Sequence, residues 1–254
     1  MDNYMITVAY DGTNYRGWQV QGNTGNTIQG KLQNILTTLA GEDIEVHGSG
    51  RTDAGVHAIG QIANFHIDTP DGMTPRDLLL HLNRYLPEDI AVTDISIADP
   101  RFHARLSAKS KTYRYRIHVS SISDVFQKKY VYTYTDSPLN AENMRQAAVY
   151  MIGTHEFTSF CGNRHMKKSA IRTVTDITIT EINDSFGLKE MDIDFIGDGF
   201  LQNMVRIMTG TLIEVGTGRR KPDEIPEIIE AKNRSLAGYT APPQGLCLMK
   251  VSYD

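Results

Sequence analysis

The segment HGSGRTDAGVHA, residues 47–58, combines an arginine, a threonine and an aspartate (Arg51, Thr52 and Asp53) with glycines at positions 48, 50 and 55. An aspartate carboxylate can serve as a nucleophile, and an arginine guanidinium can bind phosphate. Glycine permits positive φ and lets a ligand approach the backbone closely, so the segment fits a tight turn as well as a site. The segment by itself does not decide between these interpretations.

Two acid-free stretches concentrate positive charge in a chain whose formal net charge is −4. The first covers residues 100–123, and its basic and histidine side chains are Arg101, His103, Arg105, Lys109, Lys111, Arg114, Arg116 and His118. The second, FTSFCGNRHMKKSAIRTVT, contributes Arg164, Lys167, Lys168 and Arg172. Such segments indicate a local polyanion-binding surface. The alternative is that they are solvated faces neutralised by acids elsewhere in the fold.

The composition is that of a soluble globular protein: 254 residues, 40% hydrophobic and 22% charged, enough for one large domain or two moderate ones. No apolar run approaches the roughly 18 to 20 residues that span a bilayer, and the first ten residues lack a basic region before an apolar stretch. We therefore expect a cytoplasmic protein without a membrane partner. Two cysteines are too few for a disulfide framework or a cysteine-rich zinc site, so we expect reduced thiols and no metal.

The elements that position the glycine-rich segment follow the order β-α-β-β-α-β. YMITVAY alternates like a strand, and TIQGKLQNILTTLA has helical apolar spacing behind Thr27 as a cap. Two strands, DIEVHG and QIANFHI, flank the segment. A helix then begins with Thr74 as cap and Pro75 in the first helical position, before the strand IAVTDISIA.

The second half repeats this order with one extra helix. Its expected elements are the strand KTYRYRIHV, a helix capped by Asn140, strands at TDITITEI and MDIDFI, helices at about 200–215 and 222–233, and a last strand LCLMKVSY. The sequence thus predicts an α+β fold of two similar βαββαβ halves with mainly antiparallel sheets, flanking helices and a catalytic cleft between the halves. We place the domains at residues 1–106 and 107–254.

Six segments in order along the chain resemble the tRNA pseudouridine synthases of the TruA family. They are YDGTNYRGWQVQ, GSGRTDAGVHAIGQ, RFHARLSAKSKTYRYRI, THEFTSF, FLQNMVRIMTGTLIEVGTG and APPQGLCLMKVSY. GRTDAGVHA is the most specific of them, and the resemblance covers nearly the whole chain. One departure is Val20, where the family commonly has a basic residue, which puts a phosphate contact from that position in doubt.

The resemblance implies the pseudouridine synthase fold and an isomerase that converts uridines 38, 39 and 40 of the tRNA anticodon stem-loop to pseudouridine without a cofactor. By its position in the matching motif, the family's catalytic aspartate falls on Asp53. A carboxylate that attacks the base or the sugar is the minimal equipment for the reaction. Whether it attacks C6 of the base or C1′ of the sugar stays open.

Four further residues correspond to family positions. Arg51 would bind phosphate or hold the space left by the flipped base, and Tyr113 would stack on that base. Arg206 would pair with the catalytic carboxylate, and Leu246 would line the base pocket. From the residues alone, core packing is the alternative interpretation for Tyr113 and for Leu246, and a solvated helix face is the alternative for Arg206.

The expected partners are tRNA, through its anticodon stem-loop and body, and a second copy of the chain, since relatives are homodimers. Lys167 and Lys168 would contribute to the tRNA surface. Two other classes compete: a glycoside hydrolase, with Asp11 or Asp198 as a second acid, and a non-catalytic RNA-binding module.

Overall fold

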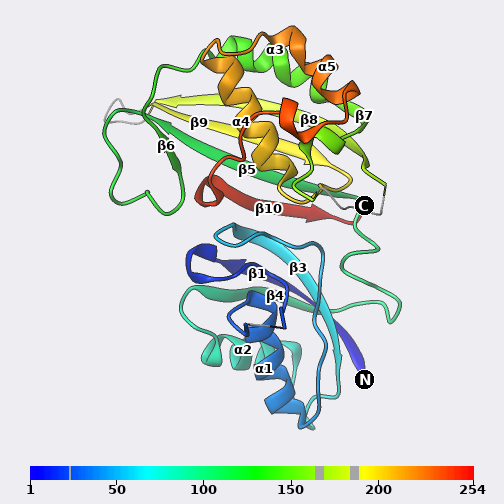
Figure 1. The fold of residues 1–254 in the computed structure, drawn as a ribbon. Helices are drawn as coiled ribbons and strands as arrows, with labels where there is room; N and C mark the ends of the chain where they lie inside the picture. The colour runs from blue at the N-terminus through cyan, green and yellow to red at the C-terminus, as the bar shows by residue number, and fades with distance from the viewer. Residues whose placement is uncertain (23, 164–168, 184–188) are drawn as a thin grey trace. The chain divides into compact units, whose positions relative to one another are not determined.

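A computed structural model describes residues 1–254 with the exception of residues 23, 164–168 and 184–188. The chain forms two compact units (Figure 1). Unit 1 comprises residues 1–109 and 248–254, and unit 2 comprises residues 110–247. The predicted domain division at residues 106 and 107 and the predicted cleft stay predictions.

Unit 1 is built on an antiparallel sheet in which β1 lies between β3 and β4, and the short β2 pairs with β3. Its elements are β1 (Asp2–Tyr10), α1 (Ile28–Ala40), β2 (His47–Gly48), β3 (His57–Ile67), α2 (Pro75–Tyr85) and β4 (Ile90–Ile97). The order β-α-β-β-α-β is as predicted. The strand expected at DIEVHG is reduced to its last two residues, His47 and Gly48.

Both helices of unit 1 begin where the sequence places their caps. The Thr27 side chain accepts from the Gly30 N–H, and Thr74 forms a capping box with Asp77 in front of Pro75. These caps satisfy N–H groups that have no partner inside a helix, which fixes the first turn of each. The core of unit 1 is formed by buried side chains of β1, β3, α1 and α2: Tyr4, Ile6, Val8, Phe65, Leu32, Leu36, Leu78 and Leu82.

Unit 2 is built on an antiparallel sheet in the order β5, β9, β8, β7, with β6 parallel to β5. Its elements are β5 (Ser110–Val119), β6 (Tyr132–Tyr134), α3 (Ala141–Met151), β7 (Gly153–Glu156), β8 (Ile171–Asn183), β9 (Lys189–Gly197), α4 (Met204–Gly216) and α5 (Ile225–Glu230). The last strand, β10 (Leu246–Ser252), begins in unit 2 and runs into the C-terminal residues of unit 1. The predicted α+β class with mainly antiparallel pairing is confirmed.

Three expectations for the second half were wrong in detail. The helix expected from about Phe200 begins at Met204, because Asn203 adopts a left-handed conformation with φ 60°. The helix expected at 222–233 is a 3-10 turn, Pro222–Glu224, followed by the short α5. β6 and β7 were not predicted, since three- and four-residue strands carry too little alternation to stand out.

Candidate active site

Asp53 lies in the connection between β2 and β3 of unit 1, and this connection is pinned at its start by Gln61. The buried Ser49 hydroxyl donates to the Gln61 side-chain oxygen at 2.6 Å, and the Gln61 amide donates to the Gly50 carbonyl at 2.9 Å. The Ser49 N–H adds a backbone bond to Ile62 at 2.7 Å. Because Ser49 and Gln61 are fully buried, these bonds hold the connection in one conformation.

The segment 10–18 packs against the same connection. The Tyr10 hydroxyl lies 2.8 Å from Thr52 Oγ1, and the Trp18 N–H donates to the Thr52 carbonyl at 3.1 Å. Gly17 has φ +95°, and a Cβ there would lie 2.5 Å from the Thr52 carbonyl oxygen. Only glycine therefore allows the two segments to approach this closely. The motifs YDGTNYRGWQVQ and GSGRTDAGVHAIGQ therefore contact each other here.

Asp53 itself opens a turn. The Val56 N–H donates to the Asp53 carbonyl at 3.1 Å, and Gly55 has φ +79°, which favours glycine. The Asp53 side chain is half-buried. A partly shielded carboxylate on a rigid turn can meet a ligand without first reorganising the backbone.

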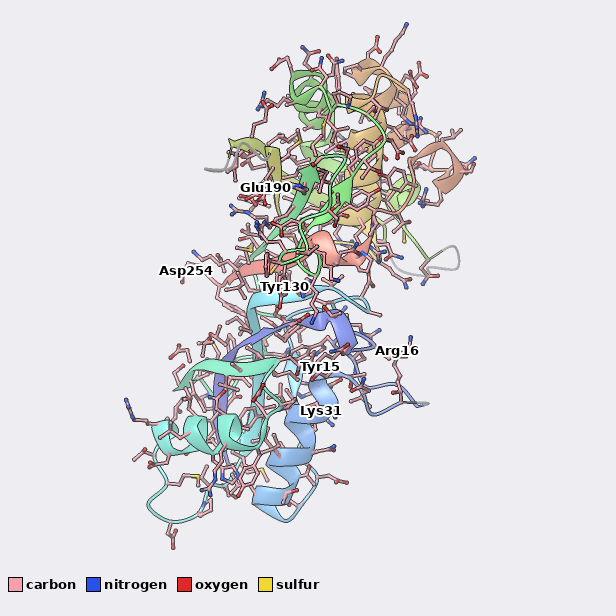
Figure 2. All side chains as sticks on the ribbon, turned by 90° about the vertical axis from the view of Figure 1, so that its left-hand side faces the viewer. Tyr15, Arg16, Lys31, Tyr130, Glu190 and Asp254 are labelled. Carbon is pink, nitrogen blue, oxygen red and sulfur yellow. The ribbon has the colours of Figure 1, made fainter. Side chains whose placement is uncertain are left out.

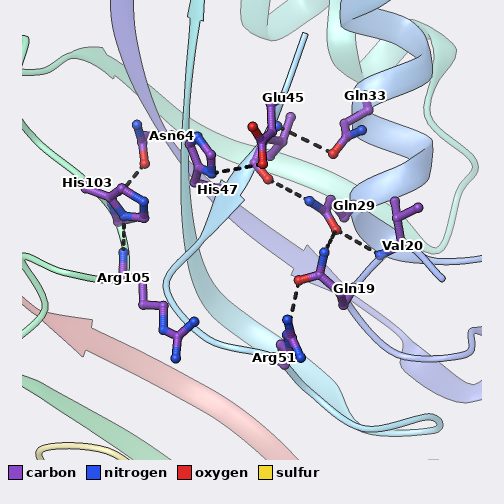
Figure 3. A network of polar contacts seen from close by, with 12 residues as sticks. Gln19, Val20, Gln29, Gln33, Glu45, His47, Arg51, Asn64, His103 and Arg105 are labelled. Atoms are coloured by element: carbon purple, nitrogen blue, oxygen red, sulfur yellow. Dashed lines mark hydrogen bonds and ion pairs between the residues drawn. The ribbon is translucent and has the colours of Figure 1, made fainter. Parts of the chain in front are cut away.

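A chain of side-chain amides connects Arg51 to α1 (Figure 3). The Arg51 guanidinium donates from Nε to Gln19 Oε1 at 3.2 Å, and Gln19 donates to Gln29 Oε1 at 2.8 Å. The buried Gln29 also accepts from the Val20 N–H and donates to the Val46 carbonyl, both at 2.8 Å. Arg51 is exposed, so this chain orients a cation that solvent or a ligand can reach.

Asp11 is engaged in local structure. Its carboxylate caps a 3-10 turn by accepting from the Thr13 N–H at 2.9 Å, and it lies 3.2 Å from Nδ1 of the buried His57. In unit 2, Asp198 accepts from the Thr173 N–H at 3.0 Å. Each of these acids has a structural role. This weakens the hypothesis that Asp11 or Asp198 is the second acid of a glycoside hydrolase.

Tyr113 lies on β5 of unit 2, in register with Phe195 of β9. Its ring meets Phe200 edge to face, with centroids 5.4 Å apart and planes at 88°. Tyr113 is 6% exposed. This packing fixes the ring plane, and it is compatible with the core role as well as with the stacking role.

Arg206 lies in the first turn of α4 and is held by two oxygens. Its Nε donates to the Ala241 carbonyl at 2.7 Å, and its Nη1 donates to Asn203 Oδ1 at 2.9 Å. The side chain is half-buried, so Arg206 does not lie on an open solvated face. Leu246 follows the same 241–245 segment and is buried at 5% exposure.

Two arginines of the first basic stretch are neutralised within unit 2. Arg114 binds Asp194 at 2.7 Å and Asp192 at 3.1 Å, and Arg116 binds Glu190 at 2.8 Å. Figure 2 labels Glu190 among the side chains of this unit. Burial raises the pKa of Asp192, which the two arginines oppose. For Arg114 and Arg116 the interpretation as a neutralised face is therefore correct.

The sequence profile of a family described as tRNA pseudouridine synthase matches residues 6–107 and 147–254. The chain belongs to the tRNA pseudouridine synthase family. A tRNA pseudouridine synthase A of Bacillus sp. (strain KSM-64) is 45% identical over 253 residues, covering 100% of both chains. One of Geobacillus sp. (strain WCH70) is 46% identical over 249 residues, 98% of this chain and 97% of the relative. A tRNA pseudouridine synthase A 2 of Bacillus anthracis is 40% identical over 253 residues, covering 100% of both chains.

As a member of the tRNA pseudouridine synthase family, the chain is an enzyme of tRNA modification and an isomerase. Unit 1 brings Asp53 and Arg51 together on one connection, whereas Tyr113, Arg206 and Leu246 belong to unit 2. Lys167 and Lys168 lie outside the described residues. Within the described part of the chain, no helix is long and apolar enough to cross a membrane. Among the same residues, no group of three or more His, Cys, Asp or Glu could hold a metal ion.

The sequence analysis did not identify the glutamines that support the candidate site. Gln19, Gln29 and Gln61 connect Arg51 and the start of the Asp53 connection to the rest of unit 1. Gln19 and Gln61 stand inside the quoted motifs, which is a usable signal. Gln29 interrupts the apolar face of α1 as a buried polar residue, and such a residue requires partners.

Proposed function

We propose that this enzyme isomerises uridines 38, 39 and 40 of the tRNA anticodon stem-loop to pseudouridine, with Asp53 as the nucleophile. The observation that carries the proposal is the placement of Asp53. A half-buried carboxylate stands on a turn fixed by Tyr10, Trp18 and Gln61, in a chain whose family is established. Such a turn keeps the carboxylate in place while the substrate base moves.

The reaction explains why one carboxylate suffices. The N1–C1′ bond of uridine breaks, a C5–C1′ bond forms, and the proton lost from C5 is balanced by one gained at N1. No electron or group is lost overall, so the chemistry requires no redox partner. Asp53 attacks either C6 of the base or C1′ of the sugar, and it is released when the new C–C bond is complete.

Arg51 supports this chemistry from the same connection. The target uridine must leave the stack, at a cost of a few kcal/mol, before Asp53 can reach it. An exposed guanidinium oriented by Gln19 suits a phosphate contact or the space vacated by the base.

The residues of unit 2 complete the proposed machinery. Tyr113 stacks on the flipped base, Leu246 lines its pocket, and Arg206 keeps the carboxylate of Asp53 ionised and oriented. Support comes from the fixed ring plane of Tyr113 and from the guanidinium of Arg206, which Asn203 and Ala241 hold in place.

The proposal includes a cytoplasmic homodimer that grips the tRNA body with one subunit and the anticodon arm with the other. A wide footprint suits an RNA recognised by shape. Lys167 and Lys168 are the proposed lysine contacts in this footprint.

Incubation of the purified protein with bulk tRNA, followed by mapping of pseudouridine, tests the proposed function. We expect new pseudouridine at positions 38, 39 and 40. Release of free uracil would instead support the glycoside hydrolase. Tight tRNA binding without either product would support the non-catalytic RNA-binding module.

A further inference from the structure

Residues 98–109 of unit 1, hereafter the RFHAR loop, are fastened to the sheet by two buried asparagines. Asn3 of β1 donates to the carbonyls of Asp99 and Phe102, both at 2.9 Å. Asn64 of β3 accepts from the Ala104 N–H at 2.8 Å and donates to Asn3 at 3.0 Å. Both asparagines are at most 3% exposed, so the loop has a fixed conformation despite its lack of regular structure.

Within the RFHAR loop, His103 is locked in one tautomer. Its Nδ1 accepts a hydrogen bond from the Arg105 N–H at 3.1 Å, so the ring proton of the neutral imidazole is on Nε2. The Ser107 N–H donates to the His103 carbonyl at 2.9 Å and closes the turn. Burial lowers the pKa of His103, and the charges of His47 and Arg105 lower it further. The ring is therefore a neutral Nε2–H donor at neutral pH.

The plane of this ring is fixed by His47, the first residue of β2. The two imidazoles stack with centroids 4.8 Å apart and planes at 28°. Glu45 Oε1 lies 3.6 Å from Nδ1 of His47 and helps to hold that ring in place (Figure 3). No hydrogen bond joins Nε2 of His103 to another described residue, and Arg105 is exposed.

We propose that His103 and Arg105 form a phosphate-binding site for the RNA backbone, in which His103 Nε2–H and the Arg105 guanidinium donate to one phosphodiester. A neutral donor in a fixed direction and an exposed guanidinium two residues further along the chain are two kinds of group that bind phosphate oxygens. His47, which stacks on His103, stands six residues before Asp53, so the Cα atoms of His47 and Asp53 lie at most about 22 Å apart and the proposed phosphate site shares unit 1 with Asp53. This inference rests on tRNA being the substrate, as proposed above.

The test is the salt dependence of tRNA binding to the full chain, measured by fluorescence anisotropy for His103→Phe and Arg105→Gln. Both substitutions should weaken binding about tenfold, because each removes a phosphate hydrogen bond. Arg105→Gln should also lower the slope of log affinity against log salt by about one, whereas His103→Phe should leave the slope unchanged, since a neutral donor displaces no counterion. The double variant should lose little more than either single variant, because both groups bind one phosphate.

Arg76→Gln and His81→Phe, on α2 of the same unit, are the matched controls and should keep the native affinity and slope. Native affinity of Arg105→Gln, whose exposed side chain leaves folding unaffected, would overturn the proposal. An equal drop in slope for His103→Phe would overturn the neutral-donor assignment. Competition by inorganic phosphate as strong as that by tRNA would show a free-phosphate site instead. Wild-type protein that binds as expected but forms no pseudouridine would refute the proposed function and leave this site standing.

Discussion

At the scale of single residues, hydrogen bonds within each unit position the groups proposed for the site. Asp53 stands on a turn, Arg51 is oriented through Gln19, and Arg206 bridges Ala241 and Asn203. A planar guanidinium can serve two acceptors in a fixed geometry, which a lysine ammonium cannot do in the same way. The identity of the cation therefore matters as much as its charge.

Arg206→Lys should lower the single-turnover rate of pseudouridine formation by about a hundredfold while changing tRNA affinity little, because the loss is one of orientation. Arg219→Lys, at an exposed position of the same unit, is the control and should retain the native rate. If Arg206→Lys weakens binding strongly and keeps the single-turnover rate, Arg206 is a phosphate contact and not the partner of Asp53.

Gly17→Ala should destabilise the fold and slow the reaction together. A methyl group at φ +95° carries a strain of roughly 1 to 2 kcal/mol. It would also lie 2.5 Å from the Thr52 carbonyl and displace the connection that carries Asp53. Gly72→Ala, with φ +79° and no atom within 4 Å of the added carbon, isolates the strain and should keep the native rate. Equal rates for both variants, measured at saturating tRNA, would contradict the coupling of Gly17 to the site.

At the scale of elements, the sequence predicted the helices that have a capping residue and a clear apolar periodicity. Thr27, Thr74 and Asn140 each cap the helix expected to follow them. The start of α4 was wrong by four residues, because a left-handed Asn203 is set by its tertiary contacts and leaves no periodic signal. Arg114 and Arg116 were assigned to a basic surface because the pairing of β5 with β9, which supplies their acids, is not visible in one dimension.

The candidate site was predictable only where its residues are close in the sequence. Asp53 and Arg51 share one motif, so their proximity follows from the sequence. The amide chain through Gln19 and Gln29 joins a loop to a helix, and such a contact depends on packing that no local pattern encodes. The sequence does show these glutamines among apolar or glycine-rich residues, and a polar side chain in such surroundings indicates that it has hydrogen-bond partners.

Gln29→Met should lower the free energy of unfolding by roughly 3 kcal/mol, because the buried Val46 carbonyl and the partly buried Val20 N–H would both lose their partner. Gln33→Met should cost less than about 1 kcal/mol, since Gln33 accepts only a long bond of 3.5 Å from the Val46 N–H. Urea unfolding monitored by circular dichroism measures both. Equal losses would show that the amide chain adds nothing beyond helix packing.

At the scale of the whole molecule, the distribution of charge sets the expectation for assembly. The chain carries a net charge of −4, and two arginines of its first basic stretch are already neutralised. A protein of 28.4 kDa with a net negative charge covers a tRNA better as two copies. Light scattering at micromolar concentration should therefore report a dimer. A monomer that is fully active on tRNA would contradict the shared footprint.

Neutralising Lys167 and Lys168 to glutamine should weaken tRNA binding and lower its salt slope by about two. The charge-matched control replaces Arg76 and Arg84 of α2 by glutamine and should leave the slope unchanged. An unchanged slope for the lysine variant would remove these lysines from the tRNA surface.

Asp53→Asn is the variant that decides whether Asp53 is the nucleophile. The substitution keeps the size of the side chain and its turn, so tRNA affinity should stay within about tenfold, while removal of the nucleophile should lower turnover by several orders of magnitude. Asp43→Asn, an exposed acid of the same unit, changes the charge equally and should keep full activity. The measurement is single-turnover pseudouridine formation with protein checked by mass spectrometry for deamidation. We expect no product above background for Asp53→Asn, and substantial turnover by that variant would contradict the assignment of Asp53 as the nucleophile.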